Sequence, residues 1–336
     1  MKYAALGNSE LEGSVVALGT WSFGGWTWGG QDEKMAINAV HAAIDCGINL
    51  IDTAPMYGFG RSEGIIGKAI KSHRDKIIIA SKCGLRWDCT DGVHFFNTDK
   101  DDLKEKGGEI AVYRNLRPKS IRYEVENSLK RMNIDYIDLM QTHWQDPSTP
   151  IEDSMTELLK LKDEGKIRAI GVSNATIDEI EQYLKIGKLV ADQENYSMLD
   201  YTVEKSKQLN FCDENNIAFL AYSPMAQGLL SGKITPKRKF NKGDQRLRHK
   251  RFTIENRINV QKMLNEFVPF AKEHNATMAQ LVMAWTLMQR GCTHLLIGAR
   301  NIVQAQENAA SADINLTVEE TIKMRKILEK YRSILI

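Results

Sequence analysis

The sequence predicts an α/β protein, a (β/α)8 barrel with a short N-terminal β-hairpin and long loops after several strands. Short, mostly apolar segments such as KIIIAS and YIDLM alternate with segments of helical periodicity. This order is typical of a parallel sheet covered by helices. Counting VVALG as the first, eight strands alternate with eight principal helices without a linker. We therefore expect one barrel domain, residues 1–336, that ends in a helix.

A doubly wound open sheet is the alternative architecture. It would carry a glycine-rich GxGxxG turn directly after its first strand. The first predicted strand instead runs into LGTWSFGGWTWGG, which lacks that spacing. The barrel is therefore the favoured prediction.

The individual elements follow from apolar runs and helical periodicity. KYAAL and SVVAL predict the N-terminal hairpin, turned at GNSELEG. Asn301 and Thr317 are expected to cap the last two helices, and Glu320 is placed to complete a capping box. Residues 83–117 are predicted to be irregular, and 224–254 form a second long polar stretch. Strands are expected at 48–52, 76–81, 136–141, 167–172, 189–193, 217–221 and 293–297, and helices at 32–46, 62–71, 119–132, 151–164, 176–186, 203–215, 256–274, 277–290, 301–310 and 317–333.

Composition limits the classes of function. A net charge of +2 argues against a dedicated nucleic-acid surface. The first residues lack the apolar segment of a signal peptide, and no apolar run approaches the roughly 18–20 residues that cross a bilayer. Scattered cysteines without a CxxC pair argue against a metal site and for a reduced, cytoplasmic protein. The five cysteines are Cys46, Cys83, Cys89, Cys212 and Cys292.

Small, polar or aromatic residues follow every predicted strand. Because catalytic groups of such barrels gather at the C-terminal ends of the strands, these positions are expected to share one rim. In chain order they are Gly19-Thr20-Trp21, Asp52 with Tyr57 beyond it, Ser81-Lys82, Gln141-Thr142-His143-Trp144, Ser173-Asn174, Gln193, Tyr222-Ser223 and Gly298-Ala299-Arg300.

Asp52, Tyr57, Lys82 and His143 form a chemically coherent set. A buried lysine needs a partner, and Asp52 on the adjacent strand is available. An ammonium group beside the phenol is expected to lower the pKa of Tyr57 from about 10 towards the range that suits proton transfer at neutral pH. A histidine can orient a substrate oxygen or relay a proton. The set predicts protonation of an oxygen while another group attacks the carbon; a rim salt bridge beside a packed tyrosine is the alternative.

Five segments resemble the aldo-keto reductase superfamily: LIDTAPMYGFGRSEGIIG, IIASK, SLKRMNIDYIDLMQTHW, IRAIGVSN and AYSPMAQGLLSGK. They occur in the order of that family, and GRSEGIIGKAI and IGARNIVQAQENAAS are similar to its bacterial branches. The resemblance implies a (β/α)8 barrel in which hydride passes between a nicotinamide and a carbonyl carbon. It also implies that Tyr57 is the general acid or base, that Lys82 and Asp52 tune it, and that His143 orients the substrate.

The same resemblance implies a cofactor site. Ser173, Asn174 and Gln193 would hold the nicotinamide carboxamide, and Tyr222 would stack on the ring, unless it only packs in the core. Arg300, just before a helix N-terminus, would hold a 2′-phosphate. We therefore expect NADP(H), with NAD(H) as the alternative if Arg300 is only a solvated cation. The other residues expected to line the cofactor are Gly19, Thr20, Trp21, Ser223, Leu229, Ser231, Lys233, Gly298, Ala299, Gln304, Glu307 and Asn308.

The positions of the tryptophans suggest the substrate. Five of the six follow predicted strands, where flat rings would suit a sugar, a polyol or a keto-sugar; the alternative is that they only pack loops together. The segment 83–117 is expected to cover the pocket, with its Asp- and Lys-rich second half in solvent. The residues expected to contact substrate are Trp21, Trp26, Arg86, Trp87 and Trp144.

Two other functions stay open at the level of sequence. The superfamily includes potassium-channel β-subunits, which keep the barrel and the cofactor but act by docking to a partner. An epimerase that retains its nicotinamide between half-reactions is the second alternative. The complete Asp-Tyr-Lys-His set favours a reaction on a small carbonyl or alcohol, while the exact substrate, the direction of reaction and the oligomeric state stay open.

Overall fold

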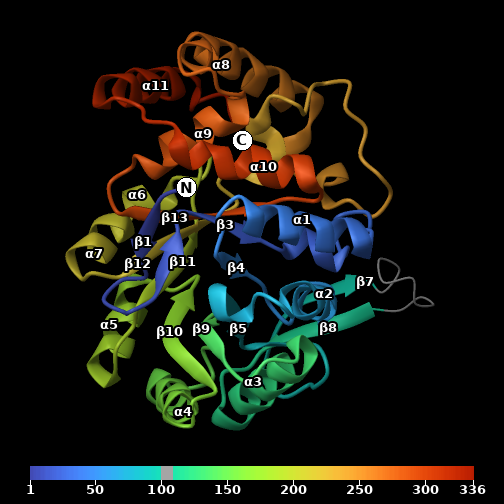
Figure 1. Cartoon of the computed structure of the whole chain (residues 1–336), viewed down its shortest axis with the longest axis vertical. Helices are drawn as coiled ribbons and strands as arrows, with labels where there is room; N and C mark the ends of the chain where they lie inside the picture. The colour runs from blue at the N-terminus through green and yellow to red at the C-terminus, as the bar shows by residue number, and fades with distance from the viewer. Residues whose placement is uncertain (100–108) are drawn as a thin grey trace.

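Eight parallel strands close into a barrel in the computed structural model, which describes residues 1–99 and 109–336 (Figure 1). The predicted fold class is confirmed. The barrel closes where its last strand pairs with its first, from Leu295 opposite Val16 to Gly298 opposite Gly19. In order around the barrel the strands are β3 (Val16–Gly19), β4 (Leu50–Asp52), β5 (Ile78–Cys83), β9 (Ile137–Thr142), β10 (Ile167–Ser173), β11 (Ala191–Asn195), β12 (Ala218–Tyr222) and β13 (Cys292–Gly298).

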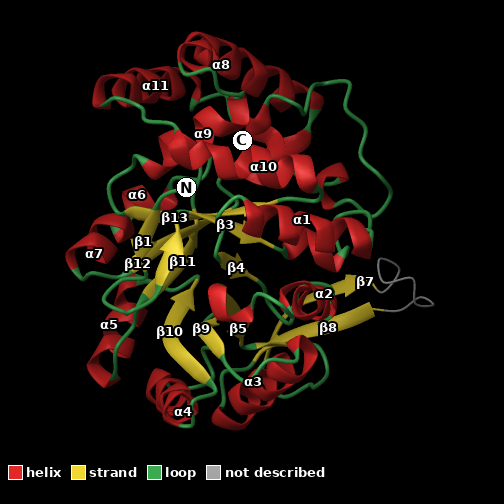
Figure 2. Ribbon diagram, in the orientation of Figure 1, coloured by secondary structure: helices red, strands yellow, loops and turns green. Residues whose placement is uncertain are grey.

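Helices surround the barrel (Figure 2). Side-chain caps fix several of their starts, and the predicted caps Asn301 and Thr317, with Glu320 in a capping box, are confirmed. No helix in the described ranges is both long enough and apolar enough to cross a membrane. The helices are α1 (Glu33–Asp45), α2 (Arg61–Ile70), α3 (Pro118–Met132), α4 (Ile151–Asp163), α5 (Ile177–Ile186), α6 (Thr202–Lys205), α7 (Gln208–Glu214), α8 (Ile254–Glu273), α9 (Met278–Leu287), α10 (Ile302–Ala310) and α11 (Val318–Tyr331).

The inward-facing residues change from apolar to polar along the barrel axis. Alternate residues of a strand share one face, so Leu50 lies below Asp52 in β4, and Ala80 lies below Lys82 in β5. The apolar layers exclude water beneath the polar residues at the C-terminal ends of the strands. These layers include Ala17, Leu50, Ala80, Leu139, Ala169, Ala191, Ala218, Leu220 and Leu296, with Leu6 of the N-terminal segment packed against them.

Two predicted elements differ in detail. The N-terminal hairpin pairs β1 (Tyr3–Ala5) with β2 (Glu12–Ser14), so SVVAL was the wrong second strand. The reason is that most of that segment belongs to the barrel strand β3. The helix predicted at 203–215 is divided into α6 and α7, where Lys207 takes a left-handed backbone conformation with φ of 63°.

The segment 83–117 was wrongly predicted to be irregular. Its described part contains a three-stranded antiparallel sheet of β6 (Leu85–Arg86), β8 (Glu109–Arg114) and β7 (Val93–Asp99). Apolar and aromatic residues of this sheet join an apolar cluster with Trp26, so the sheet docks on the loops at the C-terminal ends of the strands. The prediction that the Asp- and Lys-rich half lies in solvent falls largely on residues 100–108, outside the described residues.

Candidate active site

Lys82 lies at the centre of a buried polar cluster at the ends of β4 and β5. The residue is 1% exposed. Its ammonium group donates to both carboxylate oxygens of Asp52, at 2.7 and 2.8 Å. It also donates to the backbone oxygen of Thr53 at 3.0 Å and to the hydroxyl oxygen of Tyr57 at 3.1 Å. Direct hydrogen bonds therefore join three of the four residues of the predicted catalytic set.

His143, the fourth residue of that set, lies edge-on to the phenol of Tyr57. The two ring centres are 6.0 Å apart and the rings cross at 81°. The residue follows β9, and Asn174 Nδ2 donates to its backbone oxygen at 2.9 Å, which fixes the chain at this point. The fold thus brings all four predicted side chains to one place.

Burial sets the protonation states in this cluster. Burial, and then the charge of Asp52 and the electrostatic effect of Tyr222, raise the pKa of Tyr57 well above its usual 10.0. Burial lowers the pKa of Lys82 from 10.5, although Asp52 opposes that change. Burial and the Lys82 ammonium together lower the pKa of His143 well below 6.5. At neutral pH the phenol and the imidazole are therefore both uncharged.

The expectation that Lys82 lowers the pKa of Tyr57 was wrong. A carboxylate 2.7 Å away compensates part of the ammonium charge, so the stabilisation that Lys82 gives a phenolate offsets only part of the cost of burying that anion. In the described part of the chain the phenol oxygen only accepts a hydrogen bond from Lys82. The phenol proton of Tyr57 is therefore available to another acceptor, as a proton-donating role would require.

The residues predicted to hold a nicotinamide carboxamide form one connected network. Tyr222 donates its hydroxyl proton to Asn174 Oδ1 at 2.8 Å, and Asn174 Nδ2 donates to Ser173 Oγ at 3.0 Å. Ser173 Oγ donates to the backbone oxygen of Gln193 at 2.8 Å. Gln193 Nε2 in turn donates to Asp52 Oδ1 at 2.8 Å. The network therefore ties the predicted cofactor residues to the carboxylate beside Lys82.

Buried polar atoms at the same end of the barrel lack partners. Among the described residues, Gln141 Nε2, Asn195 Oδ1, Gln227 Oε1 and Trp28 Nε1 are buried and make no hydrogen bond. All four residues lie near the C-terminal ends of strands or in the loops that follow them. Buried polar atoms are nearly always paired in native proteins. This set of donors and acceptors therefore fits a polar ligand such as a nicotinamide cofactor.

Arg300 is bound to the loop that follows β3. Its Nε donates to Gln31 Oε1 at 2.7 Å, and its terminal nitrogens donate to the backbone oxygens of Trp28, at 3.3 Å, and Gly30. Its backbone nitrogen donates to Gln304 Oε1 at 2.7 Å. The guanidinium is therefore not a free solvated cation, and each of its three nitrogens already donates a hydrogen bond within the protein.

Several other residues expected to line a cofactor are engaged within the protein. Leu229 is 1% exposed and packs in an apolar cluster with α8 and α9. Thr20 donates its hydroxyl proton to the backbone oxygen of Asp52 at 2.8 Å. Lys233 pairs with Glu307 at 2.6 Å. The remaining expected positions, at the ends of β3, β12 and β13, in the turn after β12 or on α10, are Gly19, Trp21, Ser223, Ser231, Gly298, Ala299 and Asn308.

Three of the tryptophans expected to contact substrate pack the β6–β8–β7 sheet onto the barrel. Trp26 stacks on Phe96 with ring centres 6.3 Å apart, and Trp144 contacts Phe95 at 5.1 Å. Trp87 packs in the same cluster. These contacts agree with the alternative reading, in which the tryptophans hold loops together.

Trp21 and Arg86 have different surroundings. The ring of Trp21 lies 6.4 Å from the ring of Tyr57, so it borders the catalytic cluster. The guanidinium of Arg86 donates to Asp88 at 2.6 Å and to Ser120 at 2.9 Å, on the N-terminal turn of α3. Only Trp21 of the two is therefore shown in contact with the catalytic set.

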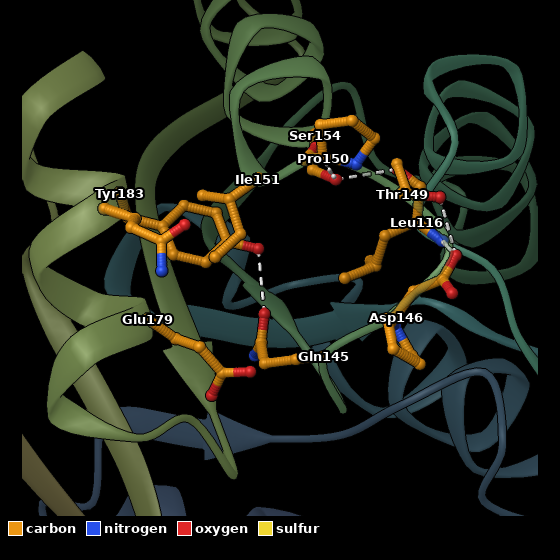
Figure 3. Close-up of a pocket in the computed structure, with 11 residues that line it drawn as sticks. Leu116, Gln145, Asp146, Thr149, Pro150, Ile151, Ser154, Glu179 and Tyr183 are labelled. Atoms are coloured by element: carbon orange, nitrogen blue, oxygen red, sulfur yellow. Dashed lines mark hydrogen bonds between the residues drawn. The ribbon is translucent and has the colours of Figure 1, made fainter.

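Two cavities lie beside this cluster rather than in it. Figure 3 shows one of about 250 Å³ between the loop after β9 and helices α4 and α5. On its wall, Gln145 accepts a hydrogen bond from Tyr183 at 2.9 Å and donates to the backbone oxygen of Ser173 at 3.2 Å. The second, of about 690 Å³, borders the N-termini of α3 and α4. No residue of the catalytic set lines either cavity.

Ser62 and Glu63 were missed in the sequence although both lie in GRSEGIIG. Each is fully buried at the first turn of α2. The signal available in the sequence was a serine and a glutamate just before an apolar helical face. In addition, no group of three or more His, Cys, Asp or Glu residues in the described ranges is arranged to hold a metal ion.

A closed parallel barrel whose polar end holds a neutral tyrosine, a buried lysine–aspartate pair and a neutral histidine has the groups that an enzyme would need to protonate an oxygen atom. Comparison with known proteins identifies the family. The sequence profile of the Aldo/keto reductase family matches residues 15–329. The chain therefore belongs to the aldo/keto reductase family, and it is an oxidoreductase that interconverts carbonyl compounds and alcohols with a nicotinamide cofactor.

Individual relatives span nearly the whole chain. An NADH-specific methylglyoxal reductase from Escherichia coli is 40% identical over 335 residues, which are 98% of this chain and 99% of that protein. The aldo-keto reductase YhdN from Bacillus subtilis is 37% identical over 98% of this chain and 94% of its own. The structure is similar to that of a glycerol dehydrogenase from Gluconobacter oxydans, with a TM-score of 0.85, 36% identity, and coverage of 98% and 95%.

Proposed function

We propose that this protein reduces small, oxygen-rich carbonyl compounds with NADH, and that Tyr57 donates the proton. The observation that carries the proposal is the 3.1 Å hydrogen bond from Lys82 to the phenol oxygen, beside the buried Asp52 carboxylate. A bound dihydronicotinamide supplies the hydride and thus two electrons to the carbonyl carbon. The carbonyl oxygen takes its proton from Tyr57, which gives an alcohol.

The neighbours of Tyr57 support this role. As the proton leaves, the phenol oxygen becomes anionic, and the Lys82 ammonium 3.1 Å away stabilises that charge. Asp52 keeps the buried lysine charged, because an unpaired ammonium would release its proton. Neutral His143 can donate from one ring nitrogen to the substrate oxygen and so orient it. Water returns the proton to Tyr57 after the product leaves.

The preference for NADH, rather than the expected NADP(H), rests on charge. A 2′-phosphate needs a cation with free donors. Arg300 already spends donors on the loop at Trp28 to Gln31, and Lys233 is neutralised by Glu307. That carboxylate would also repel a phosphate near α10. The relative from Escherichia coli is named as NADH-specific.

The preference for a small substrate rests on the packing of the tryptophans and on the relatives. Trp26, Trp87 and Trp144 are used to dock the β6–β8–β7 sheet, which leaves Trp21 as the ring beside Tyr57. Methylglyoxal and glycerol, the compounds in the names of two relatives, are both three-carbon, oxygen-rich molecules. Within the predicted range of sugars and polyols, the shortest members are therefore favoured.

Steady-state kinetics with the purified protein test both parts. Three-carbon carbonyls such as methylglyoxal and dihydroxyacetone should give a higher kcat/KM than hexoses or long apolar aldehydes, and fluorescence titration should show tighter binding of NADH than of NADPH. Tyr57→Phe should lose about 10²- to 10⁴-fold in kcat while it still binds NADH. Tyr136→Phe, at the opposite end of β9, is the matched control and should keep its turnover.

Each part can fail separately. Full turnover in Tyr57→Phe would remove the phenol from the mechanism. Tighter binding of NADPH than of NADH would overturn the cofactor assignment and leave the role of Tyr57 standing. A clear preference for hexoses or apolar aldehydes would overturn the substrate assignment alone.

A further inference from the structure

A second buried polar network lies behind the catalytic cluster, on the outer side of β4 and β5. It is built on Ser62 and Glu63 in the first turn of α2. Both residues are 0% exposed, as are Thr20, Thr53 and Ser81, the residues that they contact. Burying hydroxyl groups and a carboxylate costs free energy that apolar residues would avoid, so the network calls for a role beyond packing.

Ser62 holds the loop and the strand end that carry Tyr57 and Asp52. Its backbone nitrogen donates to the backbone oxygen of Tyr57 at 3.1 Å. Its hydroxyl donates to Thr20 Oγ1 at 2.8 Å and lies 3.1 Å from Thr53 Oγ1. Thr20 in turn donates through its backbone nitrogen and its hydroxyl to the backbone oxygen of Asp52, at 3.0 and 2.8 Å. One serine thus fixes the backbone on which two catalytic side chains stand.

Glu63 holds the strand that carries Lys82. Ser81 Oγ donates to Glu63 Oε1 at 2.8 Å. Because successive side chains of a strand point to opposite faces, Ser81 points out to α2 while Lys82 points into the barrel. Fixing Ser81 therefore fixes the backbone from which the lysine extends. Burial lowers the pKa of Lys82, and the Glu63 carboxylate, after Asp52, opposes that change.

Arg131 of α3 pairs with Glu63 inside the protein. Its Nε donates to Glu63 Oε2 at 2.6 Å. The approach is close, since a Cβ added at Gly60 would lie 2.6 Å from Arg131 Cδ, and Gly60 has a φ of 91° that favours glycine. The glycine before α2 therefore makes room for the ion pair.

We propose that Ser62 and Glu63 are positioning residues that hold β4, β5 and the Tyr57 loop in one register, so that the Lys82 ammonium stays between Asp52 and the Tyr57 hydroxyl. Ser62 acts on Asp52 and Tyr57, and Glu63 acts on Lys82. Neither residue touches the reacting atoms. The inference rests on the catalytic roles proposed above for Tyr57, Lys82 and Asp52.

Glu63→Gln tests the proposal, because glutamine keeps the shape of the side chain and removes its charge. The ionisable groups around Lys82 are Asp52, Tyr57, His143 and Glu63. Without the charge of Glu63 the ammonium is less stable, so Lys82 should lose its proton at lower pH. We expect about a 10- to 100-fold fall in kcat/KM at neutral pH and an alkaline limb of the pH profile shifted to lower pH by about one unit.

Glu157→Gln is the matched control. Glu157 is also a buried carboxylate on a helix, and it pairs with Arg122 of α3 at 2.7 Å, away from the catalytic cluster. This variant should lose stability yet keep the wild-type pH profile. An unchanged pH profile in Glu63→Gln, with only a lower melting temperature, would make Glu63 a structural residue and overturn the proposal.

Two further variants keep the test decisive if Glu63→Gln folds poorly. Ser81→Ala removes one hydrogen bond and leaves the charge of Glu63 in place, so kcat should fall at constant KM for NADH. Ser81→Thr keeps the hydroxyl and should restore kcat. Equal kcat in Ser81→Ala and the wild type overturns the positioning role. Full turnover in Tyr57→Phe, by contrast, refutes the proposed mechanism itself.

Discussion

Replacing Asp52 by asparagine removes the only carboxylate that directly contacts the ammonium of Lys82 in the described part of the chain. Lys82 is 1% exposed, and after the change its acceptors are Thr53 O at 3.0 Å, the Tyr57 hydroxyl at 3.1 Å and the uncharged amide oxygen of the introduced asparagine, so no negative charge faces the ammonium. Removing one partner of a buried ion pair lowers the free energy of unfolding by about 3–5 kcal/mol, because the other charge is left buried without compensation. We expect Asp52→Asn to lower the free energy of unfolding by this amount.

The second single variant, Lys82→Met, leaves Asp52 buried with Gln193 Nε2 as a donor at 2.8 Å. It should also be destabilised, for the same reason. The double variant Asp52→Asn/Lys82→Met contains neither charge, so its loss should be smaller than the sum of the two single losses. A coupling of about 2 kcal/mol or more is expected for a pair in direct contact.

The pH dependence gives an independent check on Asp52→Asn. The pKa of Lys82 in the folded protein is already lowered from 10.5 by burial, and loss of Asp52 lowers it further. Between the folded pKa and 10.5 the unfolded chain holds the proton and the folded protein does not, so stability rises with pH across that window. The rise should begin at lower pH and be larger in the variant than in the wild type.

Urea unfolding followed by circular dichroism, at several pH values, gives the free energy of unfolding of the wild type, the two single variants and the double variant. The slope of free energy against urea shows whether two-state analysis holds. Additive losses, within about 0.5 kcal/mol, would refute the view that Asp52 compensates the lysine charge. The same conclusion would follow if stability in Asp52→Asn showed no steeper dependence on pH.

Three further predictions concern other parts of the structure. Burial raises the pKa of Glu124 from 4.5 to about 8. Between those pH values only the folded protein holds this proton, so the free energy of unfolding falls as pH rises. The urea midpoint of Glu124→Gln should therefore fall less from pH 6 to pH 9 than that of the wild type, and an equal fall would contradict this. Trp26→Ala removes a buried ring that stacks on β7, which should lower the free energy of unfolding by about 3–5 kcal/mol. Amides of β7 should exchange hydrogen faster in Trp26→Ala than in the wild type, with the rates in Trp26→Phe between the two. Unchanged exchange rates would count against the role of Trp26 in docking the β6–β8–β7 sheet. Burial and the Lys82 ammonium lower the pKa of His143 well below 6.5, so the NMR signals of its ring should not titrate between pH 6 and 8. In Lys82→Met the pKa of His143 should rise. An imidazolium signal of His143 at pH 7 in the wild type would refute this prediction.

The sequence predicted that Asp52, Tyr57, Lys82 and His143 meet at one end of the barrel because barrel geometry is periodic. Once a strand ends at Asp52 and the next at Lys82, parallel pairing must place the two side chains together at the same end. The structure has Asp52 opposite Ala80, two residues before Lys82, which leaves both side chains facing inward. The order of strands along the chain and the alternation of side chains between the two faces of a strand follow from short segments, so a single sequence is enough to predict them.

The extra sheet was missed because its stability does not lie in its own segment. Strand β7 contains no fully buried residue, and only Ile110 and Val112 of β8 are buried. They are held by rings from distant parts of the chain, such as Trp26 and Trp144, which meet Phe96 and Phe95. A sequence shows that aromatic residues are present but not which distant residues will surround them.

By itself, the sequence determined the barrel, its polar end and the four side chains that meet there, because these follow from short-range periodicity and parallel pairing. Only the tertiary structure decided the charge states and the partners. Tyr57 is neutral because burial outweighs a lysine already compensated by Asp52. Arg300 serves a neighbouring loop because the chain folds that loop against it. Burial and partner choice depend on segments far apart along the chain, and these are fixed only when the whole chain has packed.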